Sequence, residues 1–282
     1  MITKVKAYSA WNSAPTLPLD VDGRAETDLI QIRNIDGLDP VKASVSTSPY
    51  GSVDGASYTG SSVPARNIVL TIKPNPDWDD WTYESLRRLV YQYFMPKLAT
   101  RLVFESDDID PVEISGIVES CENNMFSKDP EILVSIICPD PYFTSVDPIV
   151  LTGQTAPNAA PVTTFEYNGS VEAGIHVKIT QSLDPEPDQI GIQIGDPSIS
   201  FFAVDAVVDI NKYFEMSSVP RRKFVQNVNV NTGAITNLLS QVTAQNGAPW
   251  PVLQPGENEF SVYTNIGEHD WELTYYERFG GL

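Results

Sequence analysis

The segment 132–143 constrains the fold of this chain most strongly, because it is an apolar strand that stops abruptly. Its sequence is Ile-Leu-Val-Ser-Ile-Ile-Cys-Pro-Asp-Pro-Tyr-Phe. Proline lacks a backbone N–H and cannot continue a central strand, so the sheet must end at Pro139 and Pro141. We therefore expect one domain before this point and a second domain after it.

The length and composition are those of a globular protein. A chain of 282 residues is long enough for two domains with their own cores, and 41% of the residues are apolar. The apolar runs are far shorter than the roughly 20 residues that span a bilayer. Because no apolar segment follows the lysines at positions 4 and 6, we expect no signal peptide. We expect the protein to stay in the cytosol of the cell that makes it, unless lysis or assembly into a particle carries it out.

The chain is strongly acidic, with 37 acidic and 18 basic side chains and a formal net charge of −19. Such a charge repels nucleic acids and anionic lipids. The composition therefore argues against DNA binding, RNA binding and membrane docking through a basic patch. Solubility alone accounts for the charge equally well.

The first domain is expected to be rich in strands and to contain one helix. Alternating apolar residues predict strands at 1–13 (one weak strand), 28–35, 66–73, 99–105, 112–121 and 131–138. An apolar stripe at helical spacing runs from Trp81 to Phe94, and Met95-Pro96 ends it. We expect the carboxylates of Asp77-Trp-Asp-Asp80 to cap this helix.

The segment 44–64 is rich in serine and glycine and has few residues that could anchor a core. A stretch of this length without structure of its own is unusual inside a compact domain. One interpretation is a flexible loop, and the other is an arm that becomes ordered by packing on another chain. The candidate contact residues of an inter-subunit arm are Tyr50, Val53 and Tyr58.

The two cysteines are not expected to form a disulfide. Cys121 and Cys138 end the two strands of a predicted hairpin, which places Cys121 opposite the region of Glu131. No Cys-x-x-Cys spacing is present, so the sequence does not support a structural zinc site.

Residues 146–161 contain three prolines and a glycine and are predicted to be a linker or a connecting edge. Short strands joined by turns then predict a β-sandwich. These strands are 162–167, 174–180, 190–194, 199–204, 206–210, 224–230, 259–264 and 270–276. A single helical turn is predicted within 235–241.

No sequence pattern supports catalysis, and we expect the chain not to be an enzyme. The Gly-x-Ser-x-Gly and phosphate-loop motifs are absent, and the two histidines, His176 and His269, lie far apart in sequence without a nucleophile beside either. Alternation places His176 on the solvent side of its strand. The acidic turn 105–111 lacks the ligand order of a calcium loop, so no metal or cofactor is expected.

Exposed aromatic residues on a β-sandwich could stack on sugar rings, which leaves a carbohydrate-binding host-adhesion module as an alternative function. The candidates are Trp250, Tyr263, Trp271, Tyr275 and Tyr276. Packing in a core or at an edge is the simpler interpretation of these residues.

The order of several short motifs resembles the distal tail proteins of siphophages, which have long, non-contractile tails. In the first half these motifs are Gly37-Leu-Asp-Pro40, the serine-rich stretch with Asp54-Gly-Ala56, Arg66-Asn-Ile-Val-Leu70, Tyr91-Gln-Tyr-Phe94 and Phe126-Ser-Lys128 followed by Cys138-Pro-Asp-Pro-Tyr-Phe143. In the second half they are Gly233-Ala-Ile-Thr-Asn-Leu-Leu239, Leu253-Gln-Pro-Gly-Glu-Asn258 and Tyr275-Tyr-Glu-Arg-Phe-Gly280. No single motif decides the resemblance, but together they span nearly the whole chain.

The resemblance implies a mainly β protein of two domains. Residues 1–145 would be a ring-forming hub domain with one helix and a belt arm at about 44–64, followed by the linker 146–161 and a galectin-like β-sandwich at 162–282. It also implies a homohexameric ring at the tail tip of the virion, assembled in the host cytoplasm. This ring would join the tail tube protein to the tail-associated hub or lysin protein and the receptor-binding proteins, and would leave a channel for DNA.

Overall fold

The computed structural model shows a mainly β protein whose chain divides into two compact units. The structure describes residues 2–9, 16–21, 29–51, 53–77, 80–124, 127–156, 159–180, 187–195, 201–207, 211–244, 250–265 and 268–282. The first unit comprises Met1–Val146 together with Phe279–Leu282, and the second comprises Asp147–Arg278. The last residues of the chain therefore return to the first unit.

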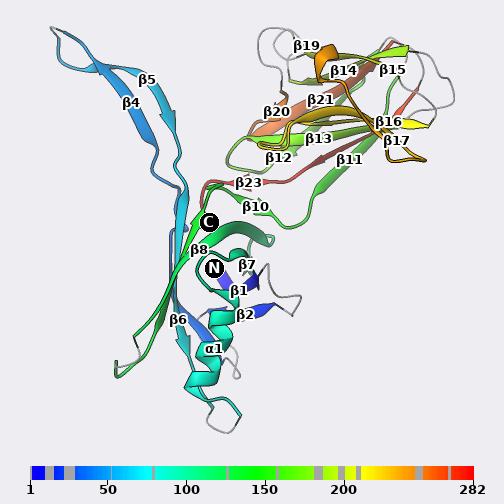
Figure 1. The fold of residues 1–282 in the computed structure, drawn as a ribbon. Helices are drawn as coiled ribbons and strands as arrows, with labels where there is room; N and C mark the ends of the chain where they lie inside the picture. Colours follow the sequence, from blue (N-terminus) through cyan, green and yellow to red (C-terminus); the bar gives the residue numbers. More distant parts are fainter. Residues whose placement is uncertain are drawn as a thin grey trace. The chain divides into compact units, whose positions relative to one another are not determined.

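The first unit is built on one large, mostly antiparallel sheet with the order β23-β10-β8-β7-β1-β2-β3-β6-β9 (Figure 1). Because β8 also pairs with β9, seven of these strands form a closed circuit. The strands are β1 (Ile2–Ser9), β2 (Leu17–Val21), β3 (Ile30–Asp36), β6 (Arg66–Pro74), β7 (Ala99–Ser106), β8 (Val112–Asn123), β9 (Ile132–Cys138), β10 (Phe143–Ser145) and β23 (Arg278–Phe279). Alternate residues of these strands fill one core, and Ile68, Leu70 and Ile72 of β6 are fully buried in it.

The predicted helix is confirmed as α1 (Tyr83–Tyr93), which follows β6 and buries Leu86 and Val90 in the same core. The predicted cap is wrong in one respect. The Oγ1 atom of Thr82 accepts the hydrogen bond from the backbone N–H of Ser85, so Thr82 is the N-cap residue. Asp77 instead accepts bonds from the N–H groups of residues 80 and 81 and closes the turn that precedes the helix. Residues 78 and 79 lie outside the described part of the chain.

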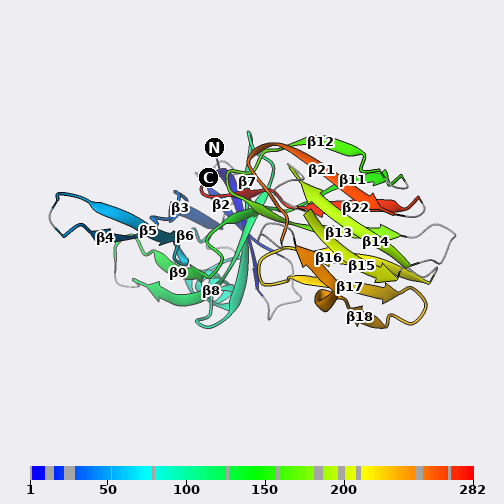
Figure 2. The same cartoon turned by 90° about the horizontal axis from the view of Figure 1, so that it is seen from above.

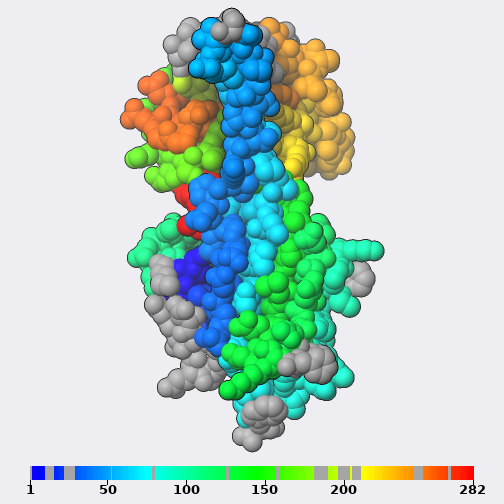
Figure 3. Space-filling view, turned by 90° about the vertical axis from the view of Figure 1, so that its left-hand side faces the viewer, coloured from blue at the N-terminus to red at the C-terminus, as the bar shows by residue number. Residues whose placement is uncertain are grey.

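The segment 44–64 has structure of its own, which corrects the prediction of an unstructured stretch. It forms a separate two-stranded antiparallel hairpin of β4 (Ser44–Pro49) and β5 (Ala56–Ser62), which we call the arm. The arm is inserted between β3 and β6, which are themselves antiparallel partners. It projects beyond the sheet of the first unit, as Figures 1 and 3 show.

The second unit consists of two sheets that share one apolar core (Figure 2). The first sheet contains β11 (Ile149–Gln154), β13 (Ala173–Thr180), β16 (Lys212–Ser217), β17 (Phe224–Asn229), β18 (Ile235–Asn237), β20 (Val252–Leu253) and β22 (Asp270–Tyr275). The second sheet contains β12 (Val162–Tyr167), β14 (Pro187–Ile194), β15 (Phe201–Val207), β19 (Val242–Ala244) and β21 (Gly256–Thr264). This arrangement is the predicted β-sandwich.

Segment 146–161, predicted to be a linker or a connecting edge, contains β11, which lies at the edge of its sheet and pairs with β22 over its whole length. The predicted strands of the second unit need two corrections. Strand β16 was not predicted, and one strand, β15, replaces the two expected at 199–204 and 206–210; residues 199–200 and 208–210 lie outside the described residues. The helical turn predicted within 235–241 is present as a short 3-10 helix (Leu239–Gln241), which follows β18.

Within the described residues, no helix has the length and apolar character needed to cross a membrane.

The two cysteines are free thiols, as expected. Cys121 lies opposite Val134 and not near Glu131, and a bulge between Val118 and Ser120 accounts for one residue of this difference in the pairing of β8 with β9. Burial raises the pKa of the Cys121 thiol to about 11 and that of Cys138 to about 12, the latter partly offset by the nearby Arg66 charge.

We therefore expect neither thiol to react with iodoacetamide at pH 8 in the native protein. The reactive thiolate is on the order of one part in 1,000 or less of each cysteine at that pH. Mass spectrometry after alkylation should show an unmodified native chain and a doubly modified chain in urea. Rapid native alkylation or an intramolecular disulfide would contradict the burial of these side chains.

Candidate assembly surface

The arm carries the largest concentration of exposed apolar side chains among the described residues. Tyr50, Val53 and Tyr58 are 55%, 71% and 65% exposed, and Val45 and Val63 are exposed as well. Tyr50 follows β4, Val53 lies in the turn and Tyr58 lies on β5, so the structure places all three predicted contact residues on one hairpin. Their role in contacts between subunits stays a prediction.

The arm has little to hold it in place apart from its own ladder of hydrogen bonds. None of its described residues is buried, and Asp54 is the only charged residue in 44–64. An isolated two-stranded hairpin is marginally stable in water. Its edges also lack the charges with which proteins normally prevent pairing with other strands. The arm thus offers apolar side chains and free strand edges to another chain.

A buried arginine lies where the arm joins the sheet. Arg66 is the first residue of β6 and is 2% exposed. Its Nε donates to the carbonyl oxygen of Pro141 at 2.6 Å, and its Nη1 donates to the carbonyl oxygens of Gly37 and, at 2.8 Å, Asp39. Its Nη2 donates to the carbonyl oxygen of Gly280. The guanidinium therefore donates hydrogen bonds to four backbone carbonyls from three separate segments.

The guanidinium also lies over the ring of Phe143, with Cζ 4.5 Å from the ring centroid. Burial lowers the pKa of Arg66 from its ordinary value, while the charge of Asp39 acts in the opposite direction. An arginine remains charged under these conditions, because its ordinary pKa is above 12. We call Arg66, its four carbonyl partners and Phe143 the arginine node.

Two glycines allow the backbone segments to approach the arginine node. Gly37 has φ +92°, and a Cβ atom there would lie 2.1 Å from the carbonyl oxygen of Asn67. A Cβ atom on Gly281 would lie 2.7 Å from Cδ of Pro40. Only glycine fits at either position without movement of the backbone.

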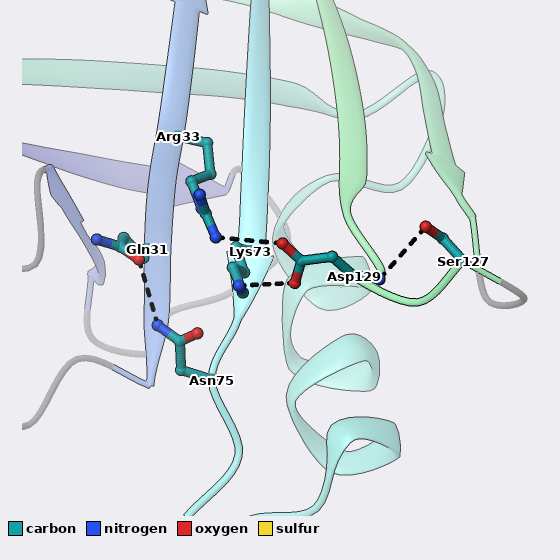
Figure 4. A network of polar contacts seen from close by, with 6 residues as sticks. All are labelled: Gln31, Arg33, Lys73, Asn75, Ser127 and Asp129. Carbon is teal, nitrogen blue, oxygen red and sulfur yellow. Dashed lines mark hydrogen bonds and ion pairs between the residues drawn. The ribbon is translucent and has the colours of Figure 1, made fainter.

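A second polar network lies on the face of the sheet formed by β3 and β6. Asp129, in the turn between β8 and β9, accepts from Lys73 Nζ at 2.6 Å and from Arg33 Nη2 at 3.3 Å (Figure 4). Beside it, Asn75 Nδ2 contacts Gln31 Oε1 at 3.5 Å. Two cations on neighbouring strands thus hold the β8–β9 turn against the sheet.

The first unit also contains an open, largely apolar cavity of about 480 Å³. It is bordered by Ile2, Ile35, Leu38, Phe104, Ile109 and Leu282, among others. The polar residues among its described lining are Arg33, Asn34, Ser106 and Asp110.

The second unit gives limited support to sugar binding. Of the five aromatic candidates, Trp271 and Tyr275 are buried in the core, where Trp271 lies edge-to-face against Phe260. Tyr276 is exposed, and Lys223 lies over the half-buried ring of Trp250. A polar hollow of about 300 Å³ is lined by Thr152, Gln154, Lys178, Thr180, Asp270 and Glu272, together with Gly153 and Trp271.

The two histidines lie in different surroundings. His176 is half-buried, less open than the predicted solvent-facing position, and its Nε2 lies 2.9 Å from Glu215 Oε1. His269 is buried. Among the residues that the structure describes, no three His, Cys, Asp or Glu side chains lie close enough together to hold a metal ion.

Replacing Asp129 with asparagine should release the β8–β9 turn. The hydrogen bond from Lys73, with the charges of Lys73 and Arg33, lowers the pKa of Asp129. A carboxyl group with a lowered pKa stabilises the fold above its unfolded pKa of about 4, and this contribution is lost as the pH falls through the folded value. In Asp129→Asn, hydrogen exchange measured by mass spectrometry should therefore increase in 127–131 at neutral pH. Hydrogen exchange in 127–131 of the wild type should approach that of the variant only below about pH 4.

Glu122→Gln provides the matched control, because it removes the same charge from an exposed position on β8. It should leave exchange in 127–131 unchanged. Equal exchange in wild type and Asp129→Asn would show that the network does not hold the turn.

Comparison with solved structures identifies relatives of this fold. The Dit protein (gp 19.1) of SPP1, described as a paradigm of the hub adsorption apparatus in phages that infect Gram-positive bacteria, matches with a TM-score of 0.64 and 16% identity. The match covers 98% of this chain and 99% of that chain. A chain of the phage P2 baseplate in its activated conformation with Ca matches with a TM-score of 0.49 and 9% identity over 100% of both chains.

No family model matches the sequence, and no curated protein matches it significantly. The chain therefore has, over nearly its whole length, the fold of the SPP1 Dit protein.

Proposed function

We propose that this chain is a structural protein of the phage tail tip. It forms a homohexameric ring that joins the tail tube to the tail-tip hub and the host-adhesion device. The observation that carries this proposal is the likeness to SPP1 Dit, because it extends across both units and includes nearly every residue of both chains. A shared fold does not by itself transfer a function, so the proposal also depends on the arm.

In the proposed ring, the arm of each subunit packs on its neighbour. Contacts in which one surface meets a different surface of the next subunit produce rings when the rotation closes. The arm suits such a contact, because Tyr50, Val53 and Tyr58 are exposed and its strand edges are unprotected. Burial against a neighbour would also supply the stability that an isolated hairpin lacks.

The acidic charge has a use in this assembly. Each subunit brings a formal charge of −19, and a ring multiplies it by the number of copies. Carboxylates that line a central channel would let DNA pass without binding, because like charges repel. Neutralising the carboxylates that a ring structure places in the channel should then slow DNA ejection.

The remaining parts of the proposal follow the same assembly. The first unit forms the ring, and the second unit is a galectin-like sandwich available to neighbouring tail proteins. The partners are the tail tube protein, the tail-associated hub or lysin protein and the receptor-binding proteins, and the site of action is the virion. The proposal assigns the chain no catalytic activity, metal or cofactor.

The test measures self-association of the full chain by light scattering after gel filtration, with negative-stain images of the peak. We expect a six-fold ring with a central hole. Replacing Tyr50, Val53 and Tyr58 together with serine should weaken association about 100-fold, because the lost burial is worth about 3 kcal/mol after ordering costs.

A matched control replaces Ser46, Ser48 and Thr59 with alanine, which alters three exposed residues of the same hairpin and removes only one methyl group. This control should assemble like the wild type. A wild type that stays monomeric at all concentrations, alone and with the tail tube protein, would overturn the proposed ring. Equal loss of association in the serine variant and the control would show that the apolar side chains do not carry the contact.

A further inference from the structure

The arginine node lies at the two points where the arm meets the sheet. The chain leaves β3 at Asp36, passes through Gly37 and Asp39, and enters the arm at Ser44. It returns from the arm at Ser62 and enters β6 at Arg66. Arg66 therefore stands on the returning leg of the arm, and its Nη1 binds two carbonyls of the outgoing leg.

The node provides contacts that the strand pairing does not supply. The ladder between β3 and β6 ends with Asp36 opposite Val69, and the ladder of the arm begins with Ser44 opposite Ser62. Among the described contacts, Arg66 is the side chain that joins the two legs in the interval between these ladders. Removing the guanidinium would take away this side-chain link between the two legs.

Arg66 is itself immobilised from two further directions. Its Nε binds Pro141 in the turn after β9, and its Nη2 binds Gly280 near the end of the chain. The residues beyond Gly280 are fixed as well, since the N–H of Leu282 donates to the carbonyl oxygen of Leu38 at 3.1 Å. The outgoing leg is therefore held by the guanidinium on one side and by the chain end on the other.

We propose that Arg66 is the positioning residue of the arm and sets the direction in which the arm leaves the sheet. This inference deepens the proposed function and rests on it, because an arm that docks on a neighbour must point in one direction to close a ring. Lysine cannot replace arginine here, because an ammonium group lacks the planar set of donors that reaches carbonyls of three segments at once.

The test measures the direction of the arm by the distance between two spin labels. One label is placed at the exposed Thr59 of β5 by Thr59→Cys, and the other at the exposed Glu122 of β8 by Glu122→Cys. Cys138 is buried, Cys121 is half-buried and the pKa of both thiols is raised, so the engineered thiols should label selectively. Labelled chains are diluted with unlabelled chains, so that pulsed electron paramagnetic resonance measures the distance between the two labels of one subunit.

We expect a single narrow distance distribution in the otherwise wild-type chain and loss of that narrow peak in Arg66→Lys. Arg101→Lys is the matched control in the same sheet. Arg101 binds Glu113 at 3.1 Å and stacks on Tyr8 at 4.1 Å, and it lies outside the arginine node. The control should lower the unfolding temperature and leave the distance unchanged.

A second variant covers the case in which Arg66→Lys does not fold. In Gly281→Ala, the added methyl group meets Pro40 and displaces the chain end, while Arg66 and three of its acceptors remain. We expect partial broadening in this variant. An unchanged distribution in either variant that folds, or equal broadening in Arg101→Lys, would overturn the positioning role.

The distance measurement is independent of assembly, so failure of this inference is distinguishable from failure of the proposed ring. If Arg66→Lys broadens the distribution while the serine variant of the arm still forms rings, the positioning role stands and the arm contact does not. If the distribution is unchanged in Arg66→Lys while the serine variant loses its rings, the arm contact stands and the positioning role does not.

Discussion

The structure of the first unit depends on the burial of one positive charge. Transferring an ion into a protein interior costs several kcal/mol unless polar groups replace its hydration, and Arg66 is 2% exposed. Backbone carbonyls provide that replacement, and hydrogen bonds to a charged group contribute about 1.5–3 kcal/mol each. Because the acceptors belong to the main chain, they recruit whole segments around Arg66. The charge of Arg66 therefore holds several backbone segments together. A single carboxylate partner would have neutralised the charge without joining these segments.

The arm follows from this organisation. A hairpin with exposed apolar side chains and no core of its own needs a firm attachment if it is to present those side chains in one direction. The attachment lies in the sheet, where β6 continues directly from Arg66 and buries every second residue. The firm attachment at the base of the arm therefore allows the exposed apolar surface of the arm to face one direction. Such a combination is expected of a chain that completes its fold by contact with another subunit.

Much of the local structure could be predicted from the sequence, and the errors have physical causes. Alternation predicted β6 and the helical stripe predicted α1, because both elements bury one face. The register at Cys121 was misplaced by three residues, and one of the three comes from a bulge, which leaves no signal in the alternation. The arm was predicted as a segment without structure because neither face of its strands is buried. The segment predicted to be a linker or a connecting edge contains β11, and a side chain at its Gly153 would meet the Trp271 ring.

The motifs behind the family resemblance show why the candidate surface was only partly predictable. Gly37-Leu-Asp-Pro40, Arg66, Cys138-Pro-Asp-Pro-Tyr-Phe143 and the closing Gly280 are scattered along the chain, and Arg66 and Gly280 are 214 residues apart. In the structure each of these motifs supplies a member of the arginine node. A sequence motif is recognised by its side chains, whereas every residue carries a backbone carbonyl. The spacing of residue types therefore could not predict which segments Arg66 would join. The glycines were the only trace of this convergence, because a missing side chain marks where one segment approaches another.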